Sequence, residues 1–287
     1  MAGIEILGGL GKLSEPVTAL VHRIFGSAEK ALEPWHLERM ASAKVKADRI
    51  TALGEVETKA ATERALRRLA MEATADQLNL EAVVERALPN VSADADTGAV
   101  SEAWLRTFVD NAKLATDEAA QELWAQVLAG EANSPGAFGK RALTILASLE
   151  QRDAEVFEAL ISCSIGDEGA LPIVFDVGDE VYAAAGITFD NLLDLEQLGL
   201  LTFDGLTGFN LQNQPPQVVI KYFSHHALLS LRSLEEGNSR VLEAGSVVLT
   251  RPGKELARIA SPRQLTGFMD YILKKWEVYG HEASRQM

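Results

Sequence analysis

The sequence predicts a mainly α-helical protein with a small α+β part toward its C-terminal end. No proline occurs between Pro34 and Pro89, and alanine is mixed there with Glu, Lys and Arg, which all favour helices. Residues 99–162 carry apolar side chains at helical spacing in several short segments. From residue 163 onward, short apolar runs bounded by glycine alternate with helical ones, a pattern typical of an α+β unit.

Residues 1–34 are expected to form an amphipathic segment whose main helix begins after Ser14. Serine is a preferred N-cap residue, and Pro16 fits the first turn of a helix. Apolar residues recur at steps of three or four along one face of this segment: Ile6, Leu10, Leu13, Val17, Leu20, Val21 and Ile24. Such a face joins copies of the chain or lies on a membrane surface. Oligomerisation is the preferred interpretation.

Residues 35–89 are expected to form a long, charged, alanine-rich helical region, with the helix running from about His36 to Leu88. A continuous helix of this kind would extend about 80 Å at ~1.5 Å per residue. Because its apolar positions are mostly alanine, packing against copies of itself or against the rest of the chain must stabilise it. No regular leucine heptad indicates a zipper. A break would fall near Gly54 or within residues 73–76.

Residues 99–162 are expected to form a compact helical bundle. Residues 116–118 read as an N-terminal cap with acidic side chains in the first turn. The helix that follows carries the run from Leu123 to Gly130, and residues 133–136 form a turn. Two further helices are expected at residues 143–149 and 153–161.

Residues 163–287 are expected to form a winged-helix-like α+β domain. A helix at residues 189–198, a corner at Gly199 and a strand within residues 199–205 follow one another in the order typical of that unit. Phe268 and Trp276 are expected to attach the last helix to the core. Further strands are expected at residues 171–175, 217–223 and 246–250, and further helices at residues 253–259 and 265–279.

The net charge of −14 is concentrated in the middle of the chain. Residues 1–72 carry a charge of +1, residues 73–210 a charge of −18 and residues 211–287 a charge of +3. An acidic centre repels phosphate, and residues 190–197 of the winged-helix-like part hold three acids and no base. Nucleic acid is therefore not an expected partner, although DNA binding remains the alternative that a winged helix suggests.

No catalytic, cofactor-binding or metal-binding residues are predicted. Phosphate-loop spacing fails at Gly11-Lys12 and at Gly139-Lys140, and His225-His226 is the only pair of adjacent histidines in the sequence. The single cysteine, Cys163, is expected to be a buried apolar residue. One cysteine and the lack of a signal peptide or spanning helix favour a cytoplasmic protein, located peripherally at the inner membrane if the first segment contacts lipid.

The motif around residues 123–136 resembles the bacterial family catalogued as domain of unknown function 2806, and the likeness extends through residues 140–143 and 153–157. A looser similarity reaches the abortive-infection alpha family. The resemblance implies no catalytic residues and suggests a setting in antiviral host defence. We expect a structural role for the residues that carry the motif: Leu123, Trp124, Gly130, Glu131, Pro135 and Gly136.

These observations favour a non-enzymatic interaction protein. It would self-assemble as a homo-oligomer through its N-terminal helices and present its acidic globular body to an unidentified protein partner, in the setting of anti-phage defence that the resemblance suggests. The first alternative is a membrane-acting defence effector that uses residues 1–33. The second alternative is a winged-helix DNA-binding protein.

Overall fold

The computed structural model of the chain describes residues 14–25, 57–166, 171–233 and 240–285. The chain divides into two compact units, residues 1–143 and residues 144–287. The predicted fold class is confirmed, because helices dominate and short antiparallel strands are confined to the second unit.

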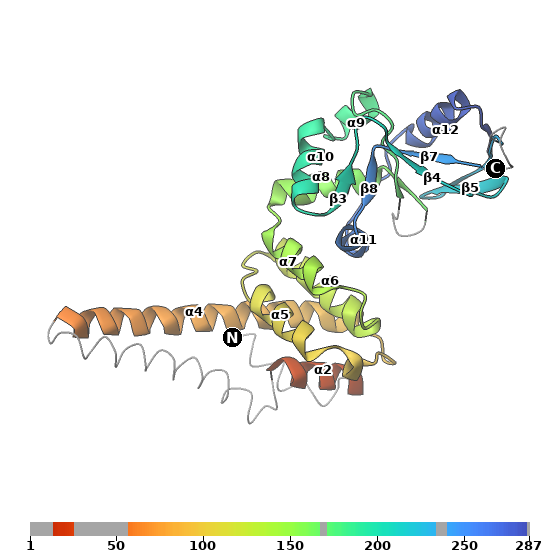
Figure 1. Cartoon of the computed structure of the whole chain (residues 1–287). Coiled ribbons are helices and arrows are strands. Elements are labelled where there is room, and N and C mark those ends of the chain that lie inside the picture. The colour runs from red at the N-terminus through yellow and green to blue at the C-terminus, as the bar shows by residue number, and fades with distance from the viewer. Residues whose placement is uncertain (1–13, 26–56, 167–170, 234–239, 286–287) are drawn as a thin grey trace. The chain divides into compact units, whose positions relative to one another are not determined.

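The first unit is helical, and a long helix, α4, is its main feature (Figure 1). α4 continues into the 3-10 turn η2, and the turn η3 precedes α5. A last helix, α7, contains the boundary between the units. The bounds are α2 (Glu15–Phe25), α4 (Glu57–Ala87), η2 (Leu88–Asn90), η3 (Thr97–Ala99), α5 (Glu102–Ala112), α6 (Glu118–Asn133) and α7 (Lys140–Ser148).

α4 is one uninterrupted helix from Glu57 to Ala87, so no break occurs at residues 73–76. Its predicted beginning, including Gly54, lies outside the described residues. Only its C-terminal part enters the core: Leu80, Val83, Val84 and Ala87 are buried, whereas no described side chain from residue 61 to residue 79 is. The first two-thirds of the described helix therefore extends beyond α5 and α6 (Figure 1).

Aromatic rings from α5 and α6 form the centre of the first unit. Trp104 stacks on Phe108 with ring centroids 5.3 Å apart, and Phe108 meets the edge of Trp124 at 5.7 Å. All three side chains are buried. The indole Nε1 of Trp104 donates to the Phe138 carbonyl at 2.7 Å, so this buried ring keeps a hydrogen-bond partner.

The second unit combines helices with short antiparallel strands. Its helices are α8 (Gln151–Ser162), α9 (Glu180–Ala184), α10 (Phe189–Gln197), α11 (Arg251–Ala257) and α12 (Phe268–Val278). Its strands are β1 (Ser164–Ile165), β2 (Leu171–Pro172), β3 (Leu201–Phe203), β4 (Phe209–Leu211), β5 (Gln217–Tyr222), β6 (His225–Ser230), β7 (Leu242–Gly245), β8 (Val247–Leu249) and β9 (Glu282–Arg285).

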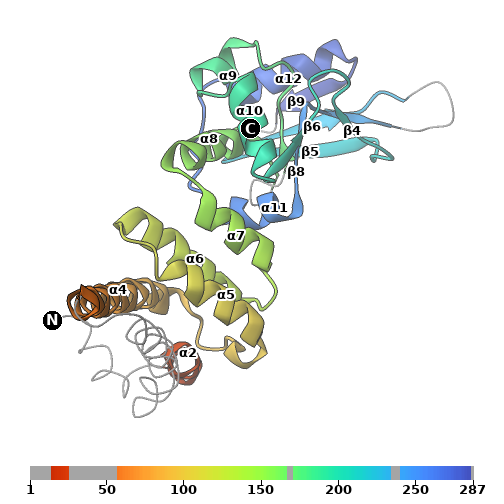
Figure 2. The same ribbon diagram turned by 60° about the vertical axis from the view of Figure 1, so that its left-hand side comes forward.

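The predicted helix, corner and strand at residues 189–203 are confirmed. α10 ends before Gly199, whose φ of 83° turns the chain into β3. β3 pairs antiparallel with β8, and β4 pairs with β7, so the chain leaves and returns along one ribbon. β5, β6 and β9 form a three-stranded sheet (Figure 2), in which the end of the described chain adds a strand to a hairpin. In the sequence, β4 to β7 therefore separate β3 from β8, the two strands that a winged helix would join.

The last helix is fixed to the core of the second unit as predicted. Phe268 and Trp276 are fully buried on α12, and the indole Nε1 of Trp276 donates to the Glu243 carbonyl at 3.0 Å. Phe268 contacts the rings of Tyr182 and Tyr222. An aromatic cluster therefore joins α12 to α9 and β5.

Candidate functional site

α4 carries an exposed apolar stripe on the side opposite its buried residues. Met71 is 73% exposed and Leu78 is 54% exposed, while Ala75 is exposed and Ala82 half-buried. Steps of four, three and four residues place these four side chains along one face of a helix. At about 100° per residue, Leu80 and the other buried residues of α4 lie on the opposite face. We refer to Met71, Ala75, Leu78 and Ala82 as the α4 stripe.

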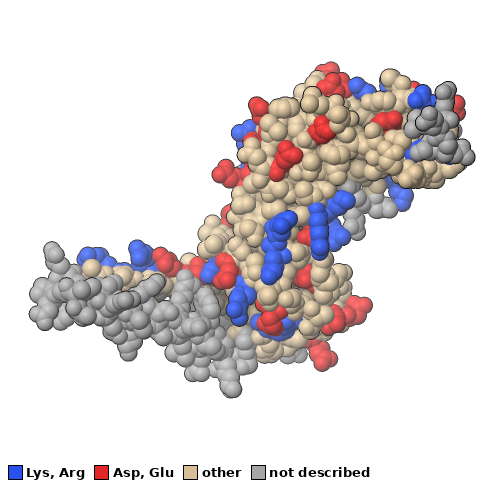
Figure 3. All heavy atoms as spheres, viewed as in Figure 1, with Lys and Arg blue, Asp and Glu red and all other residues tan. Residues whose placement is uncertain are grey.

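The two ends of the α4 stripe carry opposite charge. Arg64, Arg67 and Arg68 precede it, and Glu81 and Glu85 lie at its other end. Figure 3 shows Lys and Arg side chains toward the N-terminal end of the described helix, with Asp and Glu side chains farther along it. Two of the arginines also pair within the helix, Arg67 with Glu63 at 2.7 Å and Arg68 with Glu72 at 3.5 Å. These pairs are well exposed and contribute little to helix stability.

The apolar face predicted for oligomerisation or membrane contact is buried where the structure describes it. Val17, Leu20 and Val21 on α2 are at most 4% exposed, and α2 packs on η3 of its own chain. Ile24 is half-buried. Their own chain covers these side chains in the described structure, and their contact with a second copy or a membrane stays a prediction. The predicted residues Ile6, Leu10 and Leu13 lie outside the described part of the chain.

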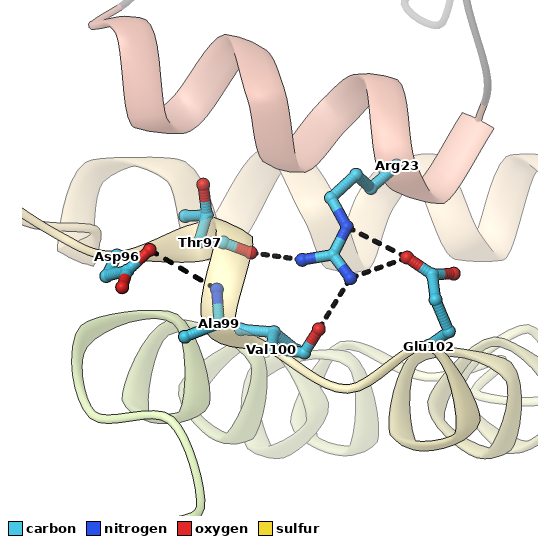
Figure 4. A network of polar contacts seen from close by, with 6 residues as sticks. All are labelled: Arg23, Asp96, Thr97, Ala99, Val100 and Glu102. Atoms are coloured by element: carbon cyan, nitrogen blue, oxygen red, sulfur yellow. Dashed lines mark hydrogen bonds and ion pairs between the residues drawn. The ribbon is translucent and has the colours of Figure 1, made fainter.

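Arg23 attaches α2 to the turn that precedes α5 (Figure 4). Its guanidinium donates to the Thr97 carbonyl, to the Val100 carbonyl at 2.5 Å and to the Glu102 carboxylate at 2.6 Å. The Thr97 hydroxyl in turn donates to the Pro16 carbonyl at 3.2 Å. One planar cation thus joins two backbone carbonyls and a carboxylate.

Replacing Arg23 by alanine is expected to release α2 from η3. The two carbonyl contacts involve a charged donor, so their loss should lower the free energy of unfolding by about 2–3 kcal/mol. Hydrogen exchange of the backbone amides of residues 17–25 is expected to accelerate. The Glu102→Gln variant is the control, because the Glu102 side chain is 79% exposed and both carbonyl contacts remain. Equal acceleration of exchange in the two variants would contradict the conclusion that the carbonyl contacts of Arg23 hold α2 in place.

The sequence motif of residues 123–136 builds the turn that leaves α6. The buried carboxylate of Glu131 accepts from the Gly136 N–H at 2.8 Å and from the Phe138 N–H at 2.9 Å. A Cβ on Gly130 would lie 2.6 Å from the ring of Phe138, and Gly136 has a φ of 91°.

The remaining residues of the motif lie around that turn. Trp124 is buried, Leu123 is half-buried, and Pro135 is exposed in the turn itself. Trp124 thus contributes to the aromatic core, and Glu131 holds the turn. The structural role of the whole motif stays a prediction.

A polar cluster on the second unit joins α9 to α12. The Tyr271 hydroxyl donates to Oδ2 of Asp179 at 2.5 Å, and Nζ of Lys275 lies 2.8 Å from the same oxygen. The Tyr182 hydroxyl donates to the Ile173 carbonyl at 2.9 Å. Asp179 and Tyr271 border an open hollow of about 620 Å³, whose wall also includes Glu180.

Burial and hydrogen bonds shift the pKa values of this cluster. Burial, together with the hydrogen bond to the Asp179 carboxylate, raises the pKa of Tyr271 far above its usual value. Burial likewise raises the pKa of Tyr182. Burial opposes the ionisation of Asp179, but hydrogen bonds from Lys275 and Tyr271 outweigh it and lower the pKa of the carboxyl. At neutral pH the two tyrosines are therefore protonated, and the Asp179 carboxylate is ionised and paired with Lys275.

The Asp179→Asn variant is expected to lose stability at neutral pH and to match the parent chain in acid. A carboxyl whose pKa is lowered by folding stabilises the protein above its unfolded pKa of about 3.9, and the gain disappears as pH falls. Because the ion pair is partly exposed, the loss at pH 7 should be no more than about 1 kcal/mol. Urea denaturation between pH 7 and pH 3 measures it. A difference that stays constant with pH would contradict this electrostatic role.

The remaining candidate residues of the sequence, Cys163 and the two adjacent histidines, lie apart from one another in the chain. Cys163 is fully buried, as predicted, and burial raises the pKa of its thiol to about 12. His225 and His226 are both exposed on β6, and no group of three or more His, Cys, Asp or Glu side chains in the described segments is placed to hold a metal ion. Within the same segments, no helix has both the length and the apolarity that a bilayer crossing requires.

The corner between α10 and β3 is apolar, exposed and acidic. Phe189 is 54% exposed and meets the edge of Phe203 at 5.3 Å, and Leu206 in the following turn is 98% exposed. Asp190 and Asp194 are exposed on the same helix, and no Lys or Arg occurs between residues 186 and 220. Figure 3 shows further Asp and Glu side chains over this part of the second unit. The corner suits a basic protein surface and repels phosphate.

Two of these features were missed by sequence reasoning. The α4 stripe had a signal in its four-three-four spacing, but alanine at two of its four positions and arginine at the preceding positions hide the pattern. The Tyr271 and Asp179 cluster had no signal, because its members are far apart in the sequence and lie on two different helices.

This fold defines a mainly helical protein of two units, and its described residues include the exposed α4 stripe and the acidic corner between α10 and β3. The family model described as "Protein of unknown function (DUF2806)" matches residues 63–273. The chain therefore belongs to this family, as its motif predicts. Comparison with curated proteins and with solved structures finds no match.

Proposed function

We propose that this protein is a non-enzymatic interaction protein that self-associates through α4. The observation that carries the proposal is the α4 stripe, where Met71 and Leu78 are largely exposed on a helix that extends beyond its own bundle. The sequence predicts self-association through N-terminal helices. The proposed contact surface lies on α4 rather than on the predicted apolar face of α2, because that face of α2 is already buried.

The composition of the α4 stripe supports reversible association. Burying an exposed Met or Leu side chain gives about 1.5–3 kcal/mol, and each copy would contribute both residues. Ordering the two copies offsets a large part of this gain. We therefore expect a dissociation constant on the order of micromolar rather than an obligate oligomer.

The acidic corner formed by α10 and β3 is the surface that the proposed assembly presents to a partner. Phe189 and Leu206 supply exposed apolar contact, and the surrounding carboxylates favour a protein with a basic surface. DNA is disfavoured by the same charges. A fluorescent duplex at low salt, where phosphate contacts are strongest, is expected not to bind.

The mass of the unmodified chain in solution tests the proposal. Sedimentation equilibrium from about 1 to 100 μM brackets a dissociation constant on the order of micromolar. We expect an average mass that rises from 31.0 kDa toward twice that value with concentration. A mass that stays at 31.0 kDa throughout would overturn self-association.

A further inference from the structure

We propose that two copies of the chain pair antiparallel along α4, so that the basic end of each α4 stripe meets the acidic end of the other. This inference rests on the proposed self-association and adds its geometry. The observations that carry it are the exposure of the stripe, its spacing and the opposite charges at its two ends.

The spacing of the apolar residues fits an antiparallel pairing of two α4 helices. Steps of four, three and four residues are those of a coiled-coil seam. With the two-fold axis next to Ala75, Met71 on one helix lies opposite Leu78 on the other. The small side chain of Ala75 lets the two backbones approach closely at the centre. The large side chains then pack on both sides of this centre, each next to a partner of similar size.

The charged residues favour the same register independently of the apolar ones. Arg64 precedes Met71 by seven residues, and Glu85 follows Leu78 by seven, so Arg64 lies opposite Glu85 of the second copy. Arg67 precedes Met71 by four residues and Glu81 follows Leu78 by three, which places this second pair close together as well. By two-fold symmetry each pair occurs twice.

A parallel arrangement has the opposite electrostatics. Each of the three arginines Arg64, Arg67 and Arg68 would then face the same arginine of the second copy. Glu81 and Glu85 would likewise face the same glutamates of that copy. Like charges across a seam are destabilising. The sequence of the helix therefore favours one orientation by attraction and disfavours the other by repulsion.

A charge exchange at Arg64 and Glu85 tests the orientation. In full-length protein at about 50 mM salt, where screening is weak, sedimentation equilibrium is expected to show about tenfold weaker association for Arg64→Glu and for Glu85→Arg. The double variant restores the attraction and is expected to return to the parent affinity within about twofold. Arg64→Lys keeps the charge and is the control, and circular dichroism verifies that each variant keeps its helix.

The outcomes separate the two proposals. A parent chain that is monomeric throughout overturns both self-association and the register. A parent chain that associates, with a double variant no better than the single ones, overturns the antiparallel register and leaves self-association standing. Single variants that associate as tightly as the parent chain also overturn the register.

Discussion

Replacing Gly245 by alanine is expected to lower the free energy of unfolding of the second unit by about 3–5 kcal/mol, near the upper end of single substitutions. A Cβ at this position would lie 2.2 Å from the carbonyl oxygen of Val174. That oxygen is held in place, because the Ser246 N–H donates to it at 2.6 Å and the Ser246 hydroxyl at 2.9 Å. The backbone must therefore move, and the ribbon of β7 and β8 must separate from the β2 segment.

Gly186 provides a matched control for this prediction. Its φ of 78° resembles the 90° of Gly245, but nothing lies within 4 Å of an added Cβ. Gly186→Ala should cost only the backbone strain, about 1–2 kcal/mol. Urea denaturation and hydrogen exchange of the Ser246 amide measure the difference. Equal losses in the two variants would show that the contact with Val174 is unimportant.

Replacing Glu131 by glutamine is expected to destabilise the first unit by about 3 kcal/mol. The carboxylate is 3% exposed and accepts two backbone N–H groups, those of Gly136 and Phe138. Glutamine removes the charge and turns one acceptor into a donor, so one buried N–H loses its partner. Hydrogen exchange of these two amides is expected to accelerate along with the loss of overall stability.

The Glu122→Gln variant on the same helix is the control. Glu122 is exposed and interacts only locally with Gln126, so its change should stay within about 0.5 kcal/mol. If Glu131→Gln proved as mild as this control, the motif would not have the structural role assigned to it.

Local patterns in the sequence predict most of the elements. Proline-free alanine-rich stretches, caps such as Asp117 and the corner at Gly199 act over a few residues, and the structure confirms each of them. The burial of Cys163, Phe268 and Trp276 also follows from composition and helical spacing. These features depend on neighbours in the chain, which a single sequence contains.

Predictions that depended on distant contacts were less successful. An amphipathic helix face such as that of Val17 and Leu20 predicts that its apolar side chains are buried. It does not predict which surface covers them. Here η3 and the Arg23 contacts provide it within the chain. The cluster of Tyr271 and Asp179 likewise depends on how α9 and α12 pack, which no local pattern encodes.

The α4 stripe lies between these two cases. Its spacing is visible in the sequence, yet many helices show apolar residues at such steps because they face their own core. Only the structure shows that Leu80 and Val83 occupy the core and that Met71 and Leu78 remain outside it. The assignment of the stripe to a second copy therefore depends on exposure and on the charges at its ends.

The measurement that tests self-association through α4 most directly compares the masses of two leucine variants at one concentration, about tenfold above the parent dissociation constant. Leu78→Glu places a charge within the α4 stripe, and Leu206→Glu makes the same change at a 98% exposed position of the second unit. We expect Leu78→Glu to sediment as a 31.0 kDa monomer, while Leu206→Glu keeps the dimer mass of the parent chain. Dimers of equal mass in both variants would contradict the assignment of α4 as the contact surface.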